Sequence, residues 1–259
     1  MLGAIAGDII GSVYEASGFK SKVFPLYDRA SRFTDDSVLT IAVARAILEG
    51  LDYRTAILEL GRRYPDAGYS GQFRAWLASE TPCAYQSYGN GAAMRVSAVG
   101  FAFDSEERVL REARKTAEIS HDHPEGIKGA QATALAVFLA RTGASKQAIG
   151  TALATRFEYD LARTVDEIRP AYRIDLSCQG TVPQAVVCFL ESDSFEDAVR
   201  NAVSLGGDSD TLACIAGTIA HAFYGPLPAD IVAGVKKMLD AELWSVTERF
   251  CARYGIEGC

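Results

Sequence analysis

The sequence has few of the features that mark secreted, membrane-spanning or nucleic-acid-binding proteins. Its six cysteines form no CxxC pair, which disfavours zinc fingers and a small disulfide framework and predicts reduced thiols in a cytoplasmic protein. The apolar first residues have no basic segment, and Asp8 interrupts them, so we expect neither a signal peptide nor a membrane span. Lys and Arg total 26 against 33 for Asp and Glu, and the resulting net charge of −7 argues against nucleic acid as a partner.

Strand patterns are also scarce. The β-compatible segment 23–27 is isolated and contains Pro25, so alternating strand and helix units cannot be assembled. Apolar residues instead repeat at helical spacing over residues 39–47 and 212–223. Further helices are expected over residues 54–64, 105–119, 126–141, 145–156, 182–190, 194–204, 228–238 and 239–254. We therefore predict a compact all-α fold, a single domain over residues 1–259, and a monomer.

Two acidic motifs stand where helices are predicted to begin. Residues 34–37 read Thr-Asp-Asp-Ser, and residues 208–211 read Asp-Ser-Asp-Thr. Each motif alone is more typical of a helix cap, because these side chains accept hydrogen bonds from first-turn amides. One cap needs one oxygen, however, whereas each motif offers two carboxylates together with hydroxyl groups. Together the motifs favour a site for two divalent cations such as Mg²⁺ or Mn²⁺, which prefer oxygen ligands.

A glycine-containing loop over residues 87–91, Ser-Tyr-Gly-Asn-Gly, leads into a helix predicted from about Ala92. Its backbone N–H groups and the helix N-terminus could hold a diphosphate. A simple Asn-Gly turn explains the loop equally well on local sequence. His121 also has two interpretations, a ligand contact or a hydrogen bond at the start of the next helix. No third His or Cys lies near His121 and His123, so the pair does not predict zinc.

These motifs resemble those of the ADP-ribosylglycohydrolase family, which includes the dinitrogenase reductase-activating glycohydrolases. Each motif alone is a weak to moderate signal, but four of them occur in the order and spacing of the family and span nearly the whole chain. The resemblance is carried by Gly3–Ser12 with Glu15, Thr34-Asp35-Asp36, Ser87–Arg95 with His121, and Gly206–Thr211.

The resemblance implies an all-α fold, a centre of two Mg²⁺ or Mn²⁺ ions, and hydrolysis of a glycosidic bond at C1″ of ADP-ribose. Glu15 would lie beside the metals as a catalytic group, and Asp35 or Asp210 would act as the general base. The implied metal ligands are Thr34, Asp35, Asp36, Asp208, Asp210 and Thr211. The implied substrate contacts are Ser87, Tyr88, Gly89, Asn90, His121 and Asp66, with Tyr85 as the nearest aromatic residue for the adenine. Asp66 is explained equally well as a turn residue.

The sequence thus predicts a metal-dependent hydrolase whose partner is an ADP-ribosylated protein, modified at a side chain such as Arg or Ser, or an ADP-ribosylated small molecule. Two alternatives stay open. One is a catalytically inactive, ADP-ribose-binding or crystallin-like protein on the same scaffold, and the other is a two-metal phosphoesterase acting on a nucleotide. The motifs do not determine the acceptor atom, because loops such as 16–32 shape the side of the cleft that the leaving group would meet.

Overall fold

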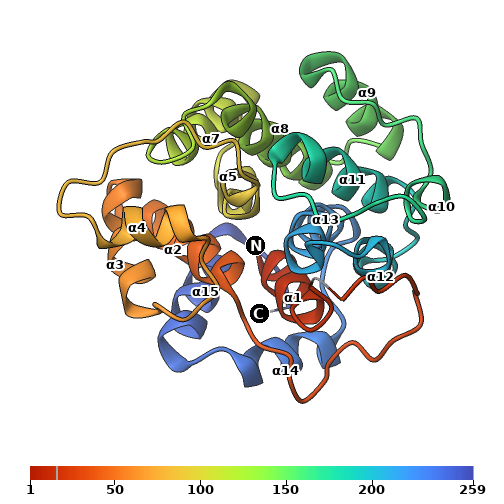
Figure 1. Cartoon of the computed structure of the whole chain (residues 1–259), viewed down its shortest axis with the longest axis horizontal. Helices are drawn as coiled ribbons and strands as arrows, with labels where there is room; N and C mark the ends of the chain where they lie inside the picture. The colour runs from red at the N-terminus through yellow and green to blue at the C-terminus, as the bar shows by residue number, and fades with distance from the viewer. Residues whose placement is uncertain (16, 259) are drawn as a thin grey trace.

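The regular secondary structure of the described residues is α-helical, which confirms the predicted fold class (Figure 1). The computed structural model describes residues 1–15 and 17–258; among them there is no strand, and one isolated antiparallel bridge joins Gly89 to Ser177. The helices are α1 (Leu2–Gly11), α2 (Asp35–Glu49), α3 (Tyr53–Arg63), α4 (Gly71–Ala78), α5 (Gly91–Met94), α6 (Ser97–Ala102), α7 (Glu106–Glu118), α8 (Pro124–Arg141), α9 (Lys146–Phe157), α10 (Val165–Ile168), α11 (Cys178–Leu190), α12 (Phe195–Leu205), α13 (Ser209–Tyr224), α14 (Ala229–Met238) and α15 (Ala241–Tyr254).

Many of these helices begin after a short polar side chain that accepts a hydrogen bond from the first turn. Asp52 caps α3, Ser105 caps α7 and Asp240 caps α15 in this way. Such a cap satisfies one of the backbone N–H groups that has no partner inside the helix. The local sequence therefore sets where these helices start.

The helices predicted from apolar periodicity are all present, namely α2, α3, α7, α8, α9 and α11 to α15. A helix was also expected from about Ala92, and α5 begins there. The short helices α4, α6 and α10 were not predicted, because a short segment shows too few repeats of a periodic pattern. The N-terminal α1 was missed for a different reason. All its residues are buried, so its sequence lacks the polar face that marks an amphipathic helix.

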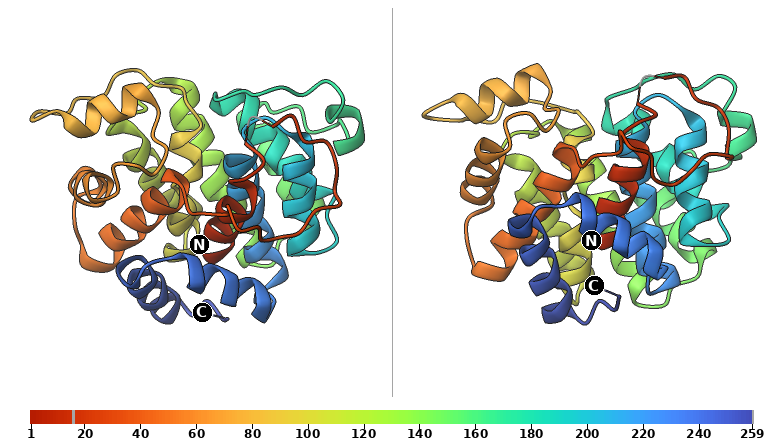
Figure 2. Two further views of the ribbon diagram at one scale, coloured as in Figure 1. Left: turned by 60° about the horizontal axis from the view of Figure 1, so that its bottom comes forward. Right: turned by 90° about the horizontal axis from the view of Figure 1, so that it is seen from below.

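Helix α1 lies against α13 in the middle of the molecule, and Figure 2 shows the same pairing from two other directions. Gly3, Gly7 and Gly11 face α13, where the two backbones approach closely. A Cβ atom added at Gly7 would lie 2.0 Å from the carbonyl oxygen of Ala213, which no real side chain tolerates. Glycine therefore permits the contact, and the contact places Asp8 beside the start of α13.

The structure bears on two predictions from the sequence, the absence of a membrane span and the reduced state of the cysteines. No helix in the part of the chain that the structure describes is long and apolar enough to cross a membrane. The prediction of reduced thiols is wrong for Cys251, which is disulfide-bonded. Cys259 lies outside the described residues, and the remaining cysteines are free thiols: Cys83, Cys178, Cys188 and Cys214.

Candidate functional site

A cleft of about 640 Å³ opens where the N-termini of α2 and α13 meet the 85–91 segment. This volume is in the range of small-molecule binding sites. Every site residue predicted from the sequence lines it, although the motifs are far apart in the chain: Glu15, Thr34, Asp35, Asp36, Asp66, Ser87, Tyr88, Gly89, Asn90, His121, Asp208, Asp210 and Thr211. The acidic motifs and the glycine loop therefore belong to one cavity.

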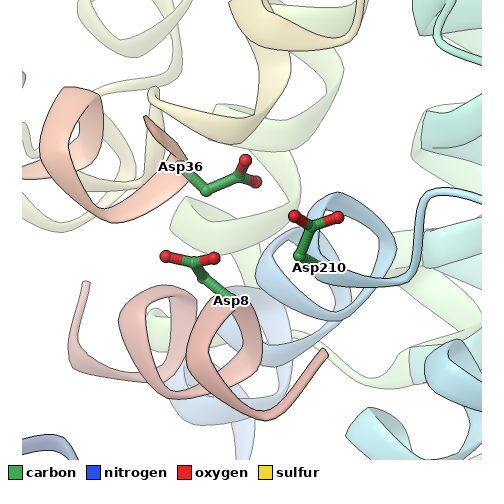
Figure 3. Close-up of side chains that lie close together, drawn as sticks. All are labelled: Asp8, Asp36 and Asp210. Carbon is green, nitrogen blue, oxygen red and sulfur yellow. The ribbon is translucent and has the colours of Figure 1, made fainter. Parts of the chain in front are cut away.

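Carboxylates from three helices point toward one another (Figure 3). Asp36 and Asp210 line the cleft, and Asp8 is buried next to them. Asp8, Asp36 and Asp210 each offer a carboxylate oxygen, and these oxygens lie within 4.8 Å of one another. Asp210 also forms a second group of the same size with Asp208 and Glu15, of which Glu15 is exposed. Asp210 belongs to both groups, as expected of a carboxylate between two cation positions.

Asp35 differs from the other predicted ligands. Among the described residues its carboxylate belongs to neither group of converging oxygens. Its backbone N–H donates to the carbonyl oxygen of Ala67, at 2.7 Å, and a Cβ at Gly68 would lie 3.4 Å from its Oδ1 atom. The segment 65–67, which contains Asp66, therefore holds the backbone of Asp35 where its residue lines the cleft.

Helix capping accounts for only part of the acidic motifs. At α2 the cap is Thr34, whose Oγ1 accepts from the N–H of Asp36 at 3.3 Å. At α13 the cap position is Asp208, which makes no side-chain capping bond. Its Oδ2 instead accepts from the side-chain amide of Asn90 at 2.5 Å. At α13 the first-turn N–H of Thr211 donates to Oδ1 of Asp210 at 3.0 Å. Capping thus uses one oxygen of Thr34 and one of Asp210, fewer than the two motifs offer.

Asp8 is the residue that sequence reasoning missed as part of the site. Its Oδ1 accepts from the hydroxyl of Thr34 at 2.6 Å, and its Oδ2 accepts from the backbone N–H groups of Thr34 and Ser37 at 2.9 and 3.1 Å. The hydroxyl of Ser37 also donates to Oδ2. Asp8 therefore holds the start of α2 from a different helix. The available signal was a lone charge in the apolar segment 2–10.

The contact with Asp8 also orients the hydroxyl of Thr34. A hydroxyl group has one hydrogen to donate and lone pairs to offer. The hydrogen of Thr34 points to Asp8, the nearer of its two carboxylate neighbours at 2.6 Å, while Asp36 is at 3.5 Å. The lone pairs of the Thr34 oxygen are then available to accept or to ligate.

Burial and mutual repulsion make this cluster costly to ionise in the absence of a cation. Burial, and after it the charges of Asp8 and Asp208, together raise the pKa of Asp35 to about 8. The pKa of Asp8 is raised to about 6, chiefly by burial. Burial and the neighbouring carboxylates also raise the pKa of Asp36 and Asp210 well above the ordinary value.

The donor set fits a hard divalent cation. The Oδ1 atom of Asp36 is buried and has no hydrogen-bond partner in the described part of the chain. Its Oδ2 accepts from the hydroxyl of Thr211 at 3.3 Å. Mg²⁺ and Mn²⁺ take carboxylate and hydroxyl oxygens, and a bound cation would offset the repulsion that raises these pKa values. Both the oxygen ligands and the negative charge of the cluster therefore suit a divalent cation.

The glycine loop is less open than the sequence suggests. The N–H of Asn90 donates to the carbonyl oxygen of Leu176 at 2.8 Å, and the N–H of Gly89 donates to the hydroxyl of Ser87 at 3.2 Å. The helix that follows, α5, has four residues. The expectation that the backbone N–H groups of this loop are available to a diphosphate is thus wrong for Gly89 and Asn90, because one is bonded within the loop and the other to the segment before α11.

His121 lies at the other side of the loop, buried beside aromatic rings. Its ring centroid is 5.9 Å from that of Tyr85 and 6.2 Å from that of Phe73. Burial, followed by the positive charge of Arg95, lowers the pKa of His121 well below its usual value. His121 is therefore a neutral imidazole at physiological pH.

Comparisons with known proteins point to one family. A sequence model described as ADP-ribosylglycohydrolase matches residues 1–257. ADP-ribosylhydrolase ARH3 of Mus musculus is 28% identical over an alignment of 308 positions. The alignment covers 87% of this chain and 82% of the relative. The protein of the same name from Xenopus tropicalis is 25% identical, and the match covers 98% of this chain and 95% of the relative.

A solved structure extends this similarity to the fold. It is titled "ADP-ribosylglycohydrolase-related protein complex" and matches with a TM-score of 0.74 and 25% sequence identity. The match covers 98% of this chain and 96% of that chain. The helical arrangement is therefore shared along essentially the whole length of both chains.

Proposed function

The chain belongs to the ADP-ribosylglycohydrolase family, and on that premise we propose that it hydrolyses the glycosidic bond between ADP-ribose and an acceptor. The acceptor is a protein side chain such as Arg or Ser, or a small molecule. The observation that carries the proposal is the pair of converging carboxylate groups that share Asp210 at the base of the cleft. Such a site suits catalysis that depends on two divalent cations.

The residues that would hold two Mg²⁺ or Mn²⁺ ions are Thr34, Asp35, Asp36, Asp208, Asp210 and Thr211. Bound cations would supply Lewis acidity and lower the pKa of a coordinated water. Asp8 keeps the Thr34 hydroxyl oriented, and Asn90 holds the carboxylate of Asp208. These contacts prepare the ligand oxygens before substrate arrives, which limits the reorganisation that the reaction requires.

Proton transfer is assigned to carboxylates that border the cavity. Glu15 is exposed at its surface but lies near Asp208 and Asp210, and partial desolvation together with the charge of Asp208 raises its pKa. A general base works best when its pKa is near the working pH. We assign this role to Asp35 or Asp210. We place Glu15 beside the leaving group, where its carboxylate can accept a proton or pass one on.

The rest of the cleft would bind the nucleotide. The loop of Ser87, Tyr88, Gly89 and Asn90 lines it, as do His121 and Asp66. Tyr85 also lines the cleft and offers a ring surface to the base. A base with a π face stacks on such surfaces. The ribose next to the acceptor would then lie over the carboxylates.

An assay of linkages tests this function. The protein is incubated with peptides ADP-ribosylated on arginine or on serine and with a small-molecule ADP-riboside, in Mg²⁺, in Mn²⁺ and in EDTA. We expect release of ADP-ribose from at least one linkage with metal and little release with EDTA.

The outcomes separate the alternatives. Binding of ADP-ribose without turnover of any linkage would support an inactive binding protein and overturn the proposal. Release of phosphate or AMP in place of ADP-ribose would identify a phosphoesterase. Release that EDTA leaves unchanged would contradict the metal requirement.

A further inference from the structure

A chain of hydrogen bonds runs from a buried arginine to His121, behind the wall of the cleft. Arg95 is fully buried, and its pKa is lowered only to about 10, so it remains charged at neutral pH. Its Nη2 donates to the carbonyl oxygen of Thr116 at 2.6 Å and to the hydroxyl oxygen of Ser120 at 2.9 Å. The hydroxyl of Ser120 is in turn 2.8 Å from Nδ1 of His121.

The direction of the last bond follows from the chemistry of the donors. A guanidinium only donates, so Ser120 must accept from Arg95. Ser120 is fully buried, and in the described part of the chain Nδ1 of His121 is the one acceptor placed to receive its hydrogen. If Nδ1 carried a hydrogen itself, the buried hydroxyl would donate to nothing, which is costly. Ser120 therefore donates and Nδ1 accepts.

The opposite nitrogen of the ring faces the glycine loop. A Cβ atom added at Gly91 would lie 3.1 Å from Nε2 of His121, and one added at Gly89 would lie 3.5 Å from it. The absence of side chains at these positions keeps Nε2 uncovered. His121 also lines the cleft. With Nδ1 bare, a neutral ring has its hydrogen on Nε2, where it is directed at this wall.

We propose that Arg95 and Ser120 are positioning residues that fix His121 as the Nε2–H tautomer, so that the ring presents one hydrogen-bond donor to the cleft beside the glycine loop. The loop needs such a donor, because the N–H groups of Gly89 and Asn90 are already bonded within the protein. The acceptor is a phosphate oxygen of the nucleotide. This last assignment rests on the proposed function, whereas the tautomer does not.

Nitrogen NMR of the full-length protein tests the tautomer directly. The chain has three histidines, so long-range ¹H–¹⁵N correlations of ¹⁵N-histidine protein at neutral pH are assigned with the His121→Asn variant. We expect His121 to show a protonated Nε2 and a bare, hydrogen-bonded Nδ1. A protonated Nδ1, or an imidazolium, would overturn the proposal.

Matched variants test the relay. Ser120→Ala removes the donor to Nδ1, so the Nδ1 signal should shift and both tautomers should appear, while Ser120→Thr retains a hydroxyl and should restore the wild-type pattern. Ser97→Ala is the control, because Ser97 is also fully buried but its hydroxyl has no partner among the described residues. Arg95→Lys should weaken the fixed tautomer. A Ser120→Ala spectrum identical to wild type would contradict the relay.

Two ligands then separate the tautomer from its use. ADP-ribose should shift the Nε2 signal of wild-type protein, adenosine should not, and Ser120→Ala should bind ADP-ribose about fivefold more weakly by calorimetry. An equal shift with adenosine would overturn the phosphate assignment. If ADP-ribose does not bind at all, the proposed function fails while the tautomer result stands.

Discussion

The two acidic motifs look alike in sequence but are held in place by different means. At α2, Thr34 is the cap and Asp8 of another helix secures it through four hydrogen bonds to Thr34 and Ser37. At α13, Asp208 occupies the cap position without capping and is held by Asn90. Similar ligand groups are thus held in place by different residues. Helix α1 contacts both motifs, through Asp8 at Thr34 and through Gly11 at Asp210.

The variant Asp210→Asn removes the carboxylate that the two groups share, and it should have the largest effect. Its loss weakens both cation positions at once, so we expect kcat/KM to fall more than about a hundredfold, beyond the usual cost of losing a supporting residue. Without metal the same variant should melt at the wild-type temperature or higher, because one repelling charge is gone.

Asp230→Asn is the matched control, since Asp230 is an exposed first-turn aspartate of α14 outside the cleft. Activity is measured as release of ADP-ribose, and melting by calorimetry in EDTA. Near-normal turnover of Asp210→Asn would remove Asp210 from the site.

The variant Asp8→Asn breaks the support of the first motif and leaves Asn90 and Asp208 intact. The new amide cannot accept the full set of bonds from Thr34 and Ser37, so the Thr34 hydroxyl loses its fixed direction. We expect Mn²⁺ affinity to fall about 10- to 100-fold in isothermal titration. The control Asp52→Asn changes the exposed cap of α3 and should leave affinity unchanged.

A double-mutant cycle shows whether Asp8 acts through Thr34. If it does, adding Thr34→Ala to Asp8→Asn should cost less affinity than Thr34→Ala costs alone. Fully additive losses would instead show that Asp8 acts independently of Thr34, through Ser37 or as a direct ligand.

The variant Gly7→Ala disturbs the helix that contacts both motifs. A methyl group there would meet the carbonyl oxygen of Ala213, so α1 and α13 must separate. We expect a loss of about 1–3 kcal/mol in the free energy of unfolding, measured in urea, together with weaker metal binding. Gly71→Ala at the start of α4 meets nothing within 4 Å and is the control. Equal stability of the two variants would contradict this account.

The pH dependence of stability tests the same carboxylates without a substitution. In metal-free protein the pKa of Asp8 is raised to about 6 and that of Asp35 to about 8, from 3.8. Between about pH 4 and pH 8 the folded chain thus holds protons that the unfolded chain has released, so stability falls as pH rises.

Calorimetry in EDTA at about pH 5 and pH 8 should therefore give the lower melting temperature at pH 8. Saturating Mn²⁺ should shrink or reverse the difference, because metal binds the deprotonated ligands. Greater stability at pH 8 in EDTA would show that the carboxylates ionise freely in the fold.

Local sequence predicted much of the fold. Caps such as Asp52 and Ser105, together with apolar periodicity, depend on residues three or four apart, and helices of three or more turns were located from them. The fully buried α1 gave no such signal, because burial on every side leaves no polar face. Its glycines at residues 3, 7 and 11 matter only through their contact with α13.

The candidate site divides in the same way. The sequence by itself determined that each acidic motif has more side-chain oxygens than a helix cap needs, because the number of oxygens depends only on neighbouring residues. Tertiary structure decided that Asp8 joins Asp36 and Asp210, that the amide of Asn90 is already bonded, and that His121 has a buried partner behind it. Each of these follows from helices brought together across the core, where distance in space no longer depends on distance along the chain.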